Sequence, residues 1–429
     1  MRRGEEEKIR GRDEKIKDKK MRMMNKMKKW IYFSIVAVLM VTCQKPEIEI
    51  VDFDTFHVTD VKYSDVIIDG AMNPEIRTME LGDENDAKTA SISMVGLVEN
   101  LIATMQSNKV IQIAGTYTGH DINESPITLS GKIILPAKGK IKNMIVVSHW
   151  TIGSNRECPS ESFQLEGILA SKGYAVVMAD YIGYGVTANR IHPYMHLSST
   201  ATSVVDMALA AKPYLKAIGR EPESDEVILV GYSQGGSTTL GAMNIIQNRY
   251  SEELPIKEVY AGGGPYDMAA TFDIAMLEDK TGIPCAIPMI VQGLNEGDEL
   301  GLDLSEFFKP VLLEHIDEWV NSKKYSVGEI NAMLNARKVS DLMTEVGRDK
   351  HNPQTAKLYR SLMWNSILFF NPRAPLYIFH SIDDNTVPFI NATKAEEYFK
   401  GQNVTYDFDH YGPHQAGAVK FIFKVYQLL

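Results

Sequence analysis

The chain has 429 residues, of which 44% are hydrophobic and 23% are charged, and its formal net charge is −10. This composition is that of an ordinary globular protein, long enough for one large domain with an insertion or for two domains. Residues 1–29 hold 13 Lys and Arg against 6 Asp and Glu, so the rest of the chain is more acidic than the net charge suggests. An acidic body argues against a nucleic acid as partner.

A basic segment followed by an apolar run opens the chain. Residues 30–41 are uncharged and mostly apolar, and they follow the lysine-rich residues 26–29. Such a short run suits the core of a signal peptide better than a membrane span. The run leads into Val-Thr-Cys, which resembles the cleavage box of a bacterial lipoprotein with Cys43 as its lipidated N-terminus. We therefore expect residues 1–43 to be a leader and the body to be exported and membrane-anchored. A short anchor helix or an uncleaved signal is the alternative.

The next segment, residues 44–109, is predicted to be a tether and an N-terminal extension. Its first part, residues 44–65, is polar, acidic and irregular, while residues 86–107 have the apolar spacing of a helix. Residues 110–117 and 128–135 then alternate apolar and polar side chains. This alternation predicts an antiparallel pair of strands that leads into a sheet.

From residue 144 the pattern changes to short apolar strands that alternate with helices. This alternation is typical of a mostly parallel sheet that is flanked by helices on both faces. The predicted strands cover residues 144–148, 174–179, 227–230, 259–262, 376–380 and 405–408. The predicted helices cover residues 163–171, 199–217, 237–248 and 416–429.

Residues 265–374 break this alternation. The segments 302–320, 327–346 and 355–369 all read as helices, so an all-helical insertion is predicted between two strands. Such an insertion is expected to cap the carboxyl edge of the sheet, where ligands bind in these folds; a plain structural appendage is the alternative. Its large apolar side chains would line an acyl channel or simply form helix core: Phe307, Phe308, Trp319, Trp364, Phe369 and Phe370.

The sequence Gly231-Tyr232-Ser233-Gln234-Gly235 joins a predicted strand to a predicted helix. A serine on such a sharp turn points its hydroxyl out of the sheet edge, and the flanking glycines avoid a clash. The helix N-terminus behind it offers N–H groups to a developing oxyanion. Ser233 is therefore the candidate nucleophile, although the pentapeptide alone is too common to identify a hydrolase.

Partners for Ser233 follow along the chain. A serine nucleophile needs a general base, and the base needs an orienting carboxylate. Asp384 lies in the loop after the last strand but one, with Asp383 as the alternative. His414 lies just before the closing helix, with His410 as the alternative. The chain order of serine, acid and histidine favours Ser233, Asp384 and His414 as a catalytic triad.

An oxyanion hole requires two backbone N–H groups that point at the same oxygen. We expect one from Gln234, directly after the nucleophile. We expect the other from residues 148–153, the loop after the first predicted parallel strand, with Trp150 or Thr151 as the donor.

Together these features resemble an α/β-hydrolase and, more narrowly, the secretory lipase family of fungi and bacteria. The resemblance covers residues 110–429 and implies a serine esterase or lipase, with a hydrolase core at residues 110–264 and 375–429 and a helical cap inserted late in the sheet. The family usually has glycine where this chain has Trp150. Three further stretches carry the resemblance: Ser148-His149-Trp150-Thr151-Ile152-Gly153 with Cys158-Pro159-Ser160, Ala179-Asp180-Tyr181-Ile182-Gly183-Tyr184-Gly185, and His192-Pro193-Tyr194.

The remaining cysteines and histidines give weaker signals. If Cys43 is lipidated, Cys158 and Cys285 remain as a candidate disulfide or as two buried thiols, and both readings stay open. His192 and His196 are four residues apart, but a proline lies between them and no acidic third ligand is evident. We therefore predict no metal site, and the triad chemistry needs no cofactor.

The predicted activity is hydrolysis of a small-molecule or lipid ester outside the cytoplasm, through an acyl-enzyme. A serine peptidase of the same fold is one alternative. A surface lipoprotein with an inactive site that binds glycans or lipids is another. The sequence leaves the acyl length, the alcohol group and the oligomeric state open.

Overall fold

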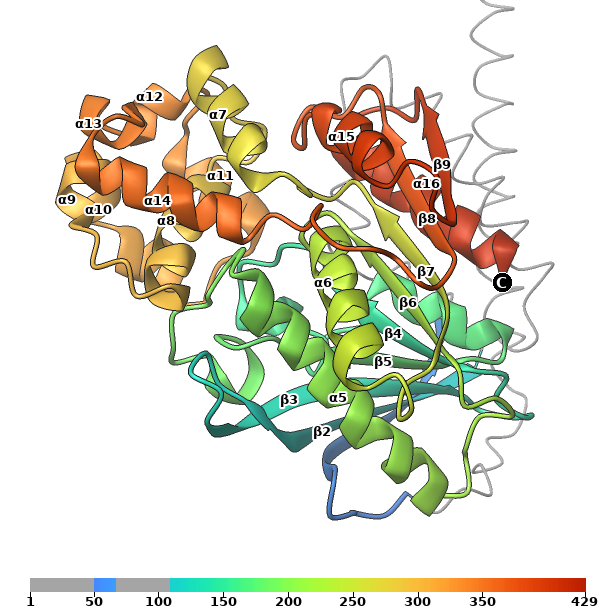
Figure 1. The fold of residues 1–429 in the computed structure, drawn as a ribbon. Coiled ribbons are helices and arrows are strands. Elements are labelled where there is room, and N and C mark those ends of the chain that lie inside the picture. Colours follow the sequence, from blue (N-terminus) through green and yellow to red (C-terminus); the bar gives the residue numbers. More distant parts are fainter. Residues whose placement is uncertain (1–49, 67–108) are drawn as a thin grey trace, which may run out of the picture. The chain divides into compact units, whose positions relative to one another are not determined.

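The computed structural model describes residues 50–66 and 109–429, and nine strands within them form one sheet (Figure 1). Their order is β1-β2-β3-β5-β4-β6-β7-β8-β9, and all pairs from β5 to β9 are parallel. The predicted mostly parallel sheet is therefore confirmed. The strands are β1 (His57–Asp65), β2 (Lys109–His120), β3 (Pro126–Pro136), β4 (Met144–Ser148), β5 (Ala175–Ala179), β6 (Val227–Tyr232), β7 (Ile256–Gly262), β8 (Leu376–Ser381) and β9 (Val404–Asp409).

Antiparallel strands lead into the parallel part of the sheet. β2 pairs with β1 and with β3, and β3 pairs with β5, all in antiparallel register. The strand pair predicted at residues 110–117 and 128–135 is confirmed. The prediction of an irregular segment at residues 44–65 is wrong for its last part, because β1 is the edge strand of the sheet. Most β1 side chains are exposed or half-buried, which explains why the segment lacks an apolar pattern.

Helices flank the sheet on both faces (Figure 1). The helices predicted at residues 199–217, 237–248 and 416–429 are confirmed, whereas the helix predicted at residues 163–171 is a 3₁₀ helix that begins at Leu165. The helices against the sheet are η1 (Asn155–Glu157), η2 (Leu165–Lys172), η3 (Gly185–Thr187), α5 (Leu197–Ala217), α6 (Gln234–Arg249), α15 (Ile390–Tyr398) and α16 (His414–Leu428).

Two apolar clusters sandwich the central strands. Every residue of β4, β5 and β6 is buried, as expected for strands covered on both faces. Side chains alternate between the faces, so Met144 and Val146 join the cluster under α5 and α6, while Ile145 and Val147 join the cluster under η2 and α16. The carboxyl ends of the parallel strands therefore meet at one edge of a rigid sheet.

Between β7 and β8 the structure contains helical segments, loops and one isolated β-bridge. These segments gather beyond the sheet edge around an apolar cluster of their own (Figure 1). They are α7 (Met268–Glu278), α8 (Ala286–Gly297), α9 (Leu304–Phe307), α10 (Pro310–Leu313), the π-helical η4 (Asp317–Asn321), α11 (Val327–Leu334), α12 (Val339–Leu342), α13 (Glu345–Arg348) and α14 (Pro353–Trp364).

The two longest helices predicted in this insertion are broken into short ones. Phe308 forms a β-bridge with Met343, so two strand-like segments interrupt the helical spacing. Pro310 reinforces the break, because proline disfavours the helical conformation in the preceding residue, and Lys309 is extended. Asn335 ends α11 in the left-handed conformation. The helices α7, α8 and α15 have no counterpart among the predicted elements.

The thiols of Cys158 and Cys285 are both free and buried. The candidate disulfide between them is therefore not formed. Cys158 lies in the apolar cluster under η2 and α16, and Cys285 lies in the separate cluster of the insertion. The predicted leader with Cys43 and the helix predicted at residues 86–107 lie outside the described residues.

Candidate active site

Ser233 occupies a sharp turn between β6 and α6. Its backbone has φ 60° and ψ −125°, a conformation that side-chain-bearing residues rarely adopt. A Cβ at Gly235 would lie 2.0 Å from the carbonyl oxygen of Ser148, and one at Gly231 would lie 2.3 Å from the carbonyl oxygen of Gly235. Both glycines are therefore required for the turn that presents Ser233 at the carboxyl edge of the sheet.

The structure brings Ser233, His414 and Asp384 together in one hydrogen-bonded chain. The Oγ of Ser233 lies 2.8 Å from Nε2 of His414, and Nδ1 of His414 lies 2.6 Å from Oδ2 of Asp384. Because a carboxylate accepts and does not donate, Nδ1 carries the proton, and Nε2 is free to accept one from the serine. The arrangement has the connectivity of a nucleophile, a base and an orienting acid.

Asp384 is held in place by its own loop. Its Oδ1 accepts hydrogen bonds from the backbone N–H groups of Thr386 and Val387, at 2.9 and 2.8 Å. Burial raises the pKa of Asp384, but the hydrogen bond and charge of His414 and the charge of His380 outweigh burial, so the pKa lies below its usual value. The acid is therefore ionised at neutral pH and oriented toward His414.

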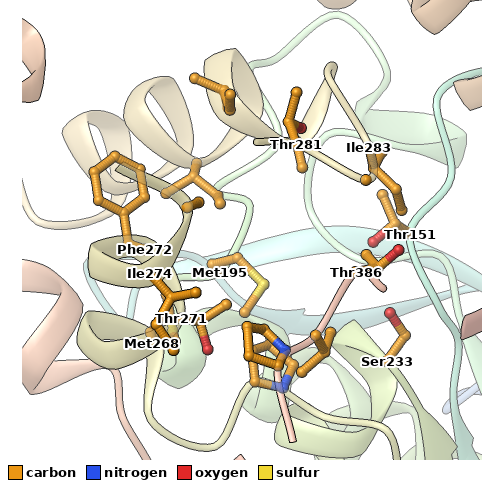
Figure 2. Close-up of a pocket in the computed structure, with 18 of the residues that line it drawn as sticks. Thr151, Met195, Ser233, Met268, Thr271, Phe272, Ile274, Thr281, Ile283 and Thr386 are labelled. Atoms are coloured by element: carbon orange, nitrogen blue, oxygen red, sulfur yellow. The ribbon is translucent and has the colours of Figure 1, made fainter. Parts of the chain in front are cut away.

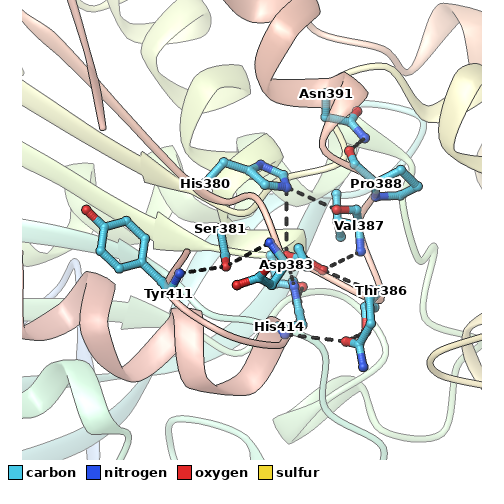
Figure 3. Close-up of polar contacts among 12 residues, drawn as sticks. His380, Ser381, Asp383, Thr386, Val387, Pro388, Asn391, Tyr411 and His414 are labelled. Carbon is cyan, nitrogen blue, oxygen red and sulfur yellow. Dashed lines mark hydrogen bonds and ion pairs between the residues drawn. The ribbon is translucent and has the colours of Figure 1, made fainter. Parts of the chain in front are cut away.

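His380 is a residue of this site that the sequence did not single out. It is buried at the end of β8, and its Nε2 lies 3.0 Å from the carbonyl oxygen of Val387 (Figure 3). The same nitrogen lies 3.7 Å from Oδ2 of Asp384. Its position four residues before Asp384, at the end of the strand, was the available signal. The acid thus lies between two histidines, one of which contacts the serine.

The alternatives Asp383 and His410 lie outside this chain of hydrogen bonds. They bond to each other at 2.8 Å, and their side chains are 44% and 68% exposed. Asp384 and His414 are buried and reach Ser233 instead. The geometry therefore favours the first choice over the alternative at both positions.

The N-terminus of α16 fixes the position of His414. His414 is the first residue of the helix, and Tyr232 donates a hydrogen bond from its hydroxyl to the carbonyl oxygen of His414 at 2.9 Å. Ser381 donates to the carbonyl oxygen of Gly412 at 2.6 Å, which ties the loop before the helix to the end of β8. The histidine is therefore positioned by the two strands that also carry the serine and the acid.

Next to Ser233, Gln234 and Thr151 face a common cavity. Gln234 is the first residue of α6, where an N–H group has no acceptor within its own helix. Thr151 lines the same cavity, and its Oγ1 lies 2.6 Å from the hydroxyl of Tyr194. Trp150 is 8% exposed and packs in the apolar cluster under η2 and α16. Of the two predicted second donors, Thr151 is the one that borders the cavity.

This cavity has a volume of about 190 Å³ and lies between the sheet edge and the insertion. Figure 2 shows Ser233 on one side of it and Met268, Thr271 and Phe272 of α7 on the other. Further apolar lining comes from Ile287, Ile290 and Leu362 of the insertion. None of the six aromatic residues suggested for an acyl channel borders it: Phe307 and Phe308 are buried in the insertion, and Trp364 and Phe369 are 85% and 77% exposed.

His192 and His196 point to different partners. His192 contacts the carbonyl oxygen of Ile182 and the side chain of Gln234, whereas His196 lies near Asp298 of the insertion. Within residues 50–66 and 109–429, no group of three or more His, Cys, Asp or Glu side chains is arranged to hold a metal ion.

Comparison with known proteins decides the family. The model of the secretory lipase family matches residues 160–420, a range that includes Ser233, Asp384 and His414. The chain belongs to the secretory lipase family. This secretory lipase is therefore a carboxylic-ester hydrolase, as the resemblance predicted. A comparison with curated proteins found no match.

Several solved structures have the same fold as this chain. The secretory lipase is similar to the rice cell wall degrading esterase LipA from Xanthomonas oryzae, at 22% identity and a TM-score of 0.66 over 77% of this chain and 92% of LipA. A structure from Legionella pneumophila matches at 23% identity and a TM-score of 0.66 over 76% and 92% of the two chains. Candida antarctica lipase A in its closed state matches at 16% identity and a TM-score of 0.55 over 74% and 78%. The predicted α/β-hydrolase fold is thus confirmed.

Membership in a family of secretory enzymes supports export of the chain. Among the helices in the described part of the secretory lipase, none is long and apolar enough to cross a membrane.

Proposed function

We propose that this secretory lipase hydrolyses carboxylic esters through a covalent acyl-enzyme on Ser233, with His414 as the general base and acid and Asp384 as the orienting carboxylate. The observation that carries the proposal is the chain of two hydrogen bonds, 2.8 and 2.6 Å long, that links the three side chains beside the cavity. A serine hydroxyl is a weak nucleophile until a base accepts its proton.

The reaction proceeds in two balanced halves. In the first, Oγ of Ser233 forms a bond to the ester carbonyl carbon while its proton moves to Nε2 of His414, and the alcohol then leaves with that proton. In the second half, water gives a proton to His414 and attacks the acyl carbon, and the acid product leaves as Oγ regains its proton. Asp384 stays ionised throughout and stabilises the imidazolium that forms twice.

The negative charge on the carbonyl oxygen is held by two N–H groups. We assign them to the backbones of Gln234 and Thr151, because both residues border the cavity next to Ser233. The N-terminus of α6 adds the positive end of its dipole at the same place. Donors fixed before the reaction need no reorganisation when the charge develops, which is why they stabilise the transition state.

The insertion at residues 265–374 acts as a cap that receives the apolar part of the ester. Its helices supply a mostly apolar wall opposite Ser233, which suits an acyl chain or an apolar alcohol group. The similar structures include a rice cell wall degrading esterase, LipA, and Candida antarctica lipase A. Both water-soluble esters and lipid esters therefore belong to the set to be tested. No contact in the cavity favours a peptide or an inactive site.

Replacement of Ser233 by alanine tests the proposal. Ser233→Ala is expected to abolish turnover of a chromogenic short-chain ester and labelling by a fluorophosphonate probe. Ser237→Ala is the matched control, because Ser237 is a buried serine in the first turn of the helix that follows Ser233, and its hydroxyl has no hydrogen-bond partner. Labelling of Ser233→Ala at the wild-type rate would overturn the proposal. A parallel series of dipeptide amides separates an esterase from a peptidase.

We also propose that the protein is exported as a lipoprotein anchored through Cys43. The support is the basic and apolar leader that precedes this cysteine, together with the membership in a secretory family. In cells grown with labelled palmitate, the wild-type protein should carry the label and Cys43→Ala should not. A Cys158→Ala variant controls for expression. Equal labelling of Cys43→Ala and wild type would exclude lipidation at Cys43.

A further inference from the structure

His192 is a buried histidine beside the candidate active site to which the proposed mechanism gives no role. It lies in the loop between η3 and α5 and is only 3% exposed. The rings of Tyr181, Tyr184 and Tyr194 surround it, with centroids 6.0, 5.0 and 5.8 Å from that of the imidazole. A Cβ at Gly183 would lie 2.5 Å from the Cα of His192, so the two backbone segments pack closely. Little space is left around this histidine.

The two ring nitrogens of His192 have different and definite roles. Nδ1 lies 2.6 Å from the carbonyl oxygen of Ile182, which can only accept, so Nδ1 carries a proton. Burial lowers the pKa of His192 to about 3, and the nearby Lys323 ammonium acts in the same direction, so the ring is neutral at physiological pH. Nε2 is therefore an acceptor. The atom it faces is Nε2 of Gln234, 3.1 Å away, which donates.

The partner of His192 is the residue that directly follows the nucleophile. Gln234 is the first residue of α6 and is 3% exposed, and its side chain is tied to His192 while its backbone is joined to Ser233. A rotation of the peptide between Ser233 and Gln234 would turn the proposed oxyanion donor away from the cavity. Such a rotation would also displace the Gln234 side chain from a partner that cannot follow it.

We propose that His192 is a positioning residue for the oxyanion hole: its Nε2 accepts the hydrogen bond from the Gln234 side chain and thereby fixes the direction of the Gln234 backbone N–H. The proposal rests on the serine mechanism proposed above. It assigns no proton transfer to His192, which keeps the same tautomer throughout. Because a well-aimed donor matters most for the developing oxyanion, the loss of this contact should lower kcat more than it changes KM.

Two amide replacements separate the two sides of the ring. In His192→Asn the amide stands near the position of Nδ1, so it can keep the contact with Ile182 but cannot reach Gln234. In His192→Gln the amide stands near the position of Nε2, so it can accept from Gln234 but loses Ile182. Each variant removes one buried hydrogen bond, so the two should lose comparable thermal stability, measured as Tm.

The measurement is kcat and KM for a chromogenic ester with the two full-length variants and wild type. We expect His192→Asn to lower kcat by roughly 10- to 100-fold with KM within about 2-fold, since removal of an entire oxyanion donor costs about 100- to 1,000-fold. His192→Gln should recover most of the rate. Equal kcat values for the two variants, or a wild-type kcat in His192→Asn, would overturn the proposal.

A double-mutant cycle with Gln234→Met tests whether His192 acts through this side chain. The methionine keeps the backbone N–H and removes the amide, so Gln234→Met should lower kcat about as much as His192→Asn. The double variant should be no worse than either single variant, whereas additive losses would contradict the proposal. Should His192→Asn fail to fold, Gln234→Met alone still decides, because a wild-type kcat in that variant refutes the role.

Failure of the serine mechanism gives a different result. If Ser233→Ala kept its turnover, the proposed function and this positioning role would both fall. If Ser233→Ala is inactive and the His192 and Gln234 variants keep their wild-type kcat, only the positioning role falls.

Discussion

The cavity beside Ser233 has two walls that are built in different ways. The core wall consists of strand ends and loops, and its polar groups are fixed by hydrogen bonds such as those from Thr386 and Val387 to Asp384. The insertion wall consists mostly of apolar side chains from α7, α8 and α14, which pack in their own cluster, and its polar members are Thr271, Glu278, Lys280 and Thr281. The first wall is suited to chemistry that is the same for every ester, and the second to discrimination among esters. Substitutions in the two walls should therefore have different kinetic signatures.

The largest effect is expected from the core wall. Asp384→Asn should lower kcat by about 10³- to 10⁴-fold for every ester, because an asparagine no longer holds His414 in the tautomer that accepts the serine proton. Steady-state kinetics with short and long acyl esters measures this loss. Asp383→Asn, one residue away and 44% exposed, is the control and should stay near the wild-type rate. A loss that differed strongly between esters would contradict the assignment of Asp384 to the common chemistry.

An intermediate effect is expected from the insertion wall. Phe272→Leu removes a ring that lines the cavity, so the ratio of kcat/KM between longer and shorter acyl chains should rise by about 10-fold. The rate of inactivation by a small fluorophosphonate should change little. Phe307→Leu is the control, since Phe307 is buried in the same insertion but does not border the cavity. An unchanged ranking of esters in Phe272→Leu would show that α7 does not contact the substrate.

A third effect, on stability rather than on activity, is expected where the insertion meets the core, at Lys323. This side chain is buried beside the ring of Tyr184, and burial lowers its pKa to about 8. Below pH 8 the lysine is charged in both states, so the folded protein bears the full free-energy cost of burying the charge. This cost falls as the pH rises toward about 10.4, the pKa of lysine in the unfolded chain. Lys323→Met should raise the free energy of unfolding at pH 7 by at most about 3 kcal/mol, at roughly 1.4 kcal/mol per pKa unit.

The pH dependence of that gain is the decisive part. Denaturant unfolding at pH 7 and pH 10 should show a clear stabilisation at the lower pH and little at the higher. Lys324→Met, at the exposed neighbouring position, should change stability little at either pH. A gain of equal size at both pH values would mean that the added apolar contact, rather than removal of the buried charge, stabilises the variant.

The same contrast explains what the sequence could predict. Ser233, Asp384 and His414 could be expected to lie together because the carboxyl ends of parallel strands meet at one edge, and the structure places their side chains within hydrogen-bond distance there. The glycines beside Ser233 are also a local signal, because they predict the sharp turn that carries the serine. For these residues, chain position relative to a strand was sufficient.

Contacts between segments that are distant in the chain could not be predicted from local sequence patterns. The bridge between Phe308 and Met343 divides helices whose apolar spacing is continuous, and β1 pairs at an edge that its polar sequence does not reveal. The choice between Trp150 and Thr151 depends on how the loop after β4 turns. The hydrogen bond from Gln234 to His192 joins residues 42 positions apart and could not be read from either segment.

The backbone conformation of Ser233 serves the reactivity of the serine but lowers the thermal stability of the protein. A non-glycine residue at φ 60° and ψ −125° costs about 1–3 kcal/mol, which exceeds the roughly 0.5–1 kcal/mol by which glycine disfavours a folded chain. A Ser233→Gly protein should therefore resist heat better than the wild type while being inert. Selection for thermal tolerance alone would drive this position away from serine. Because the Ser233→Gly protein would be both inactive and more stable to heat, it would bind an ester without cleaving it, and the complex could be crystallised.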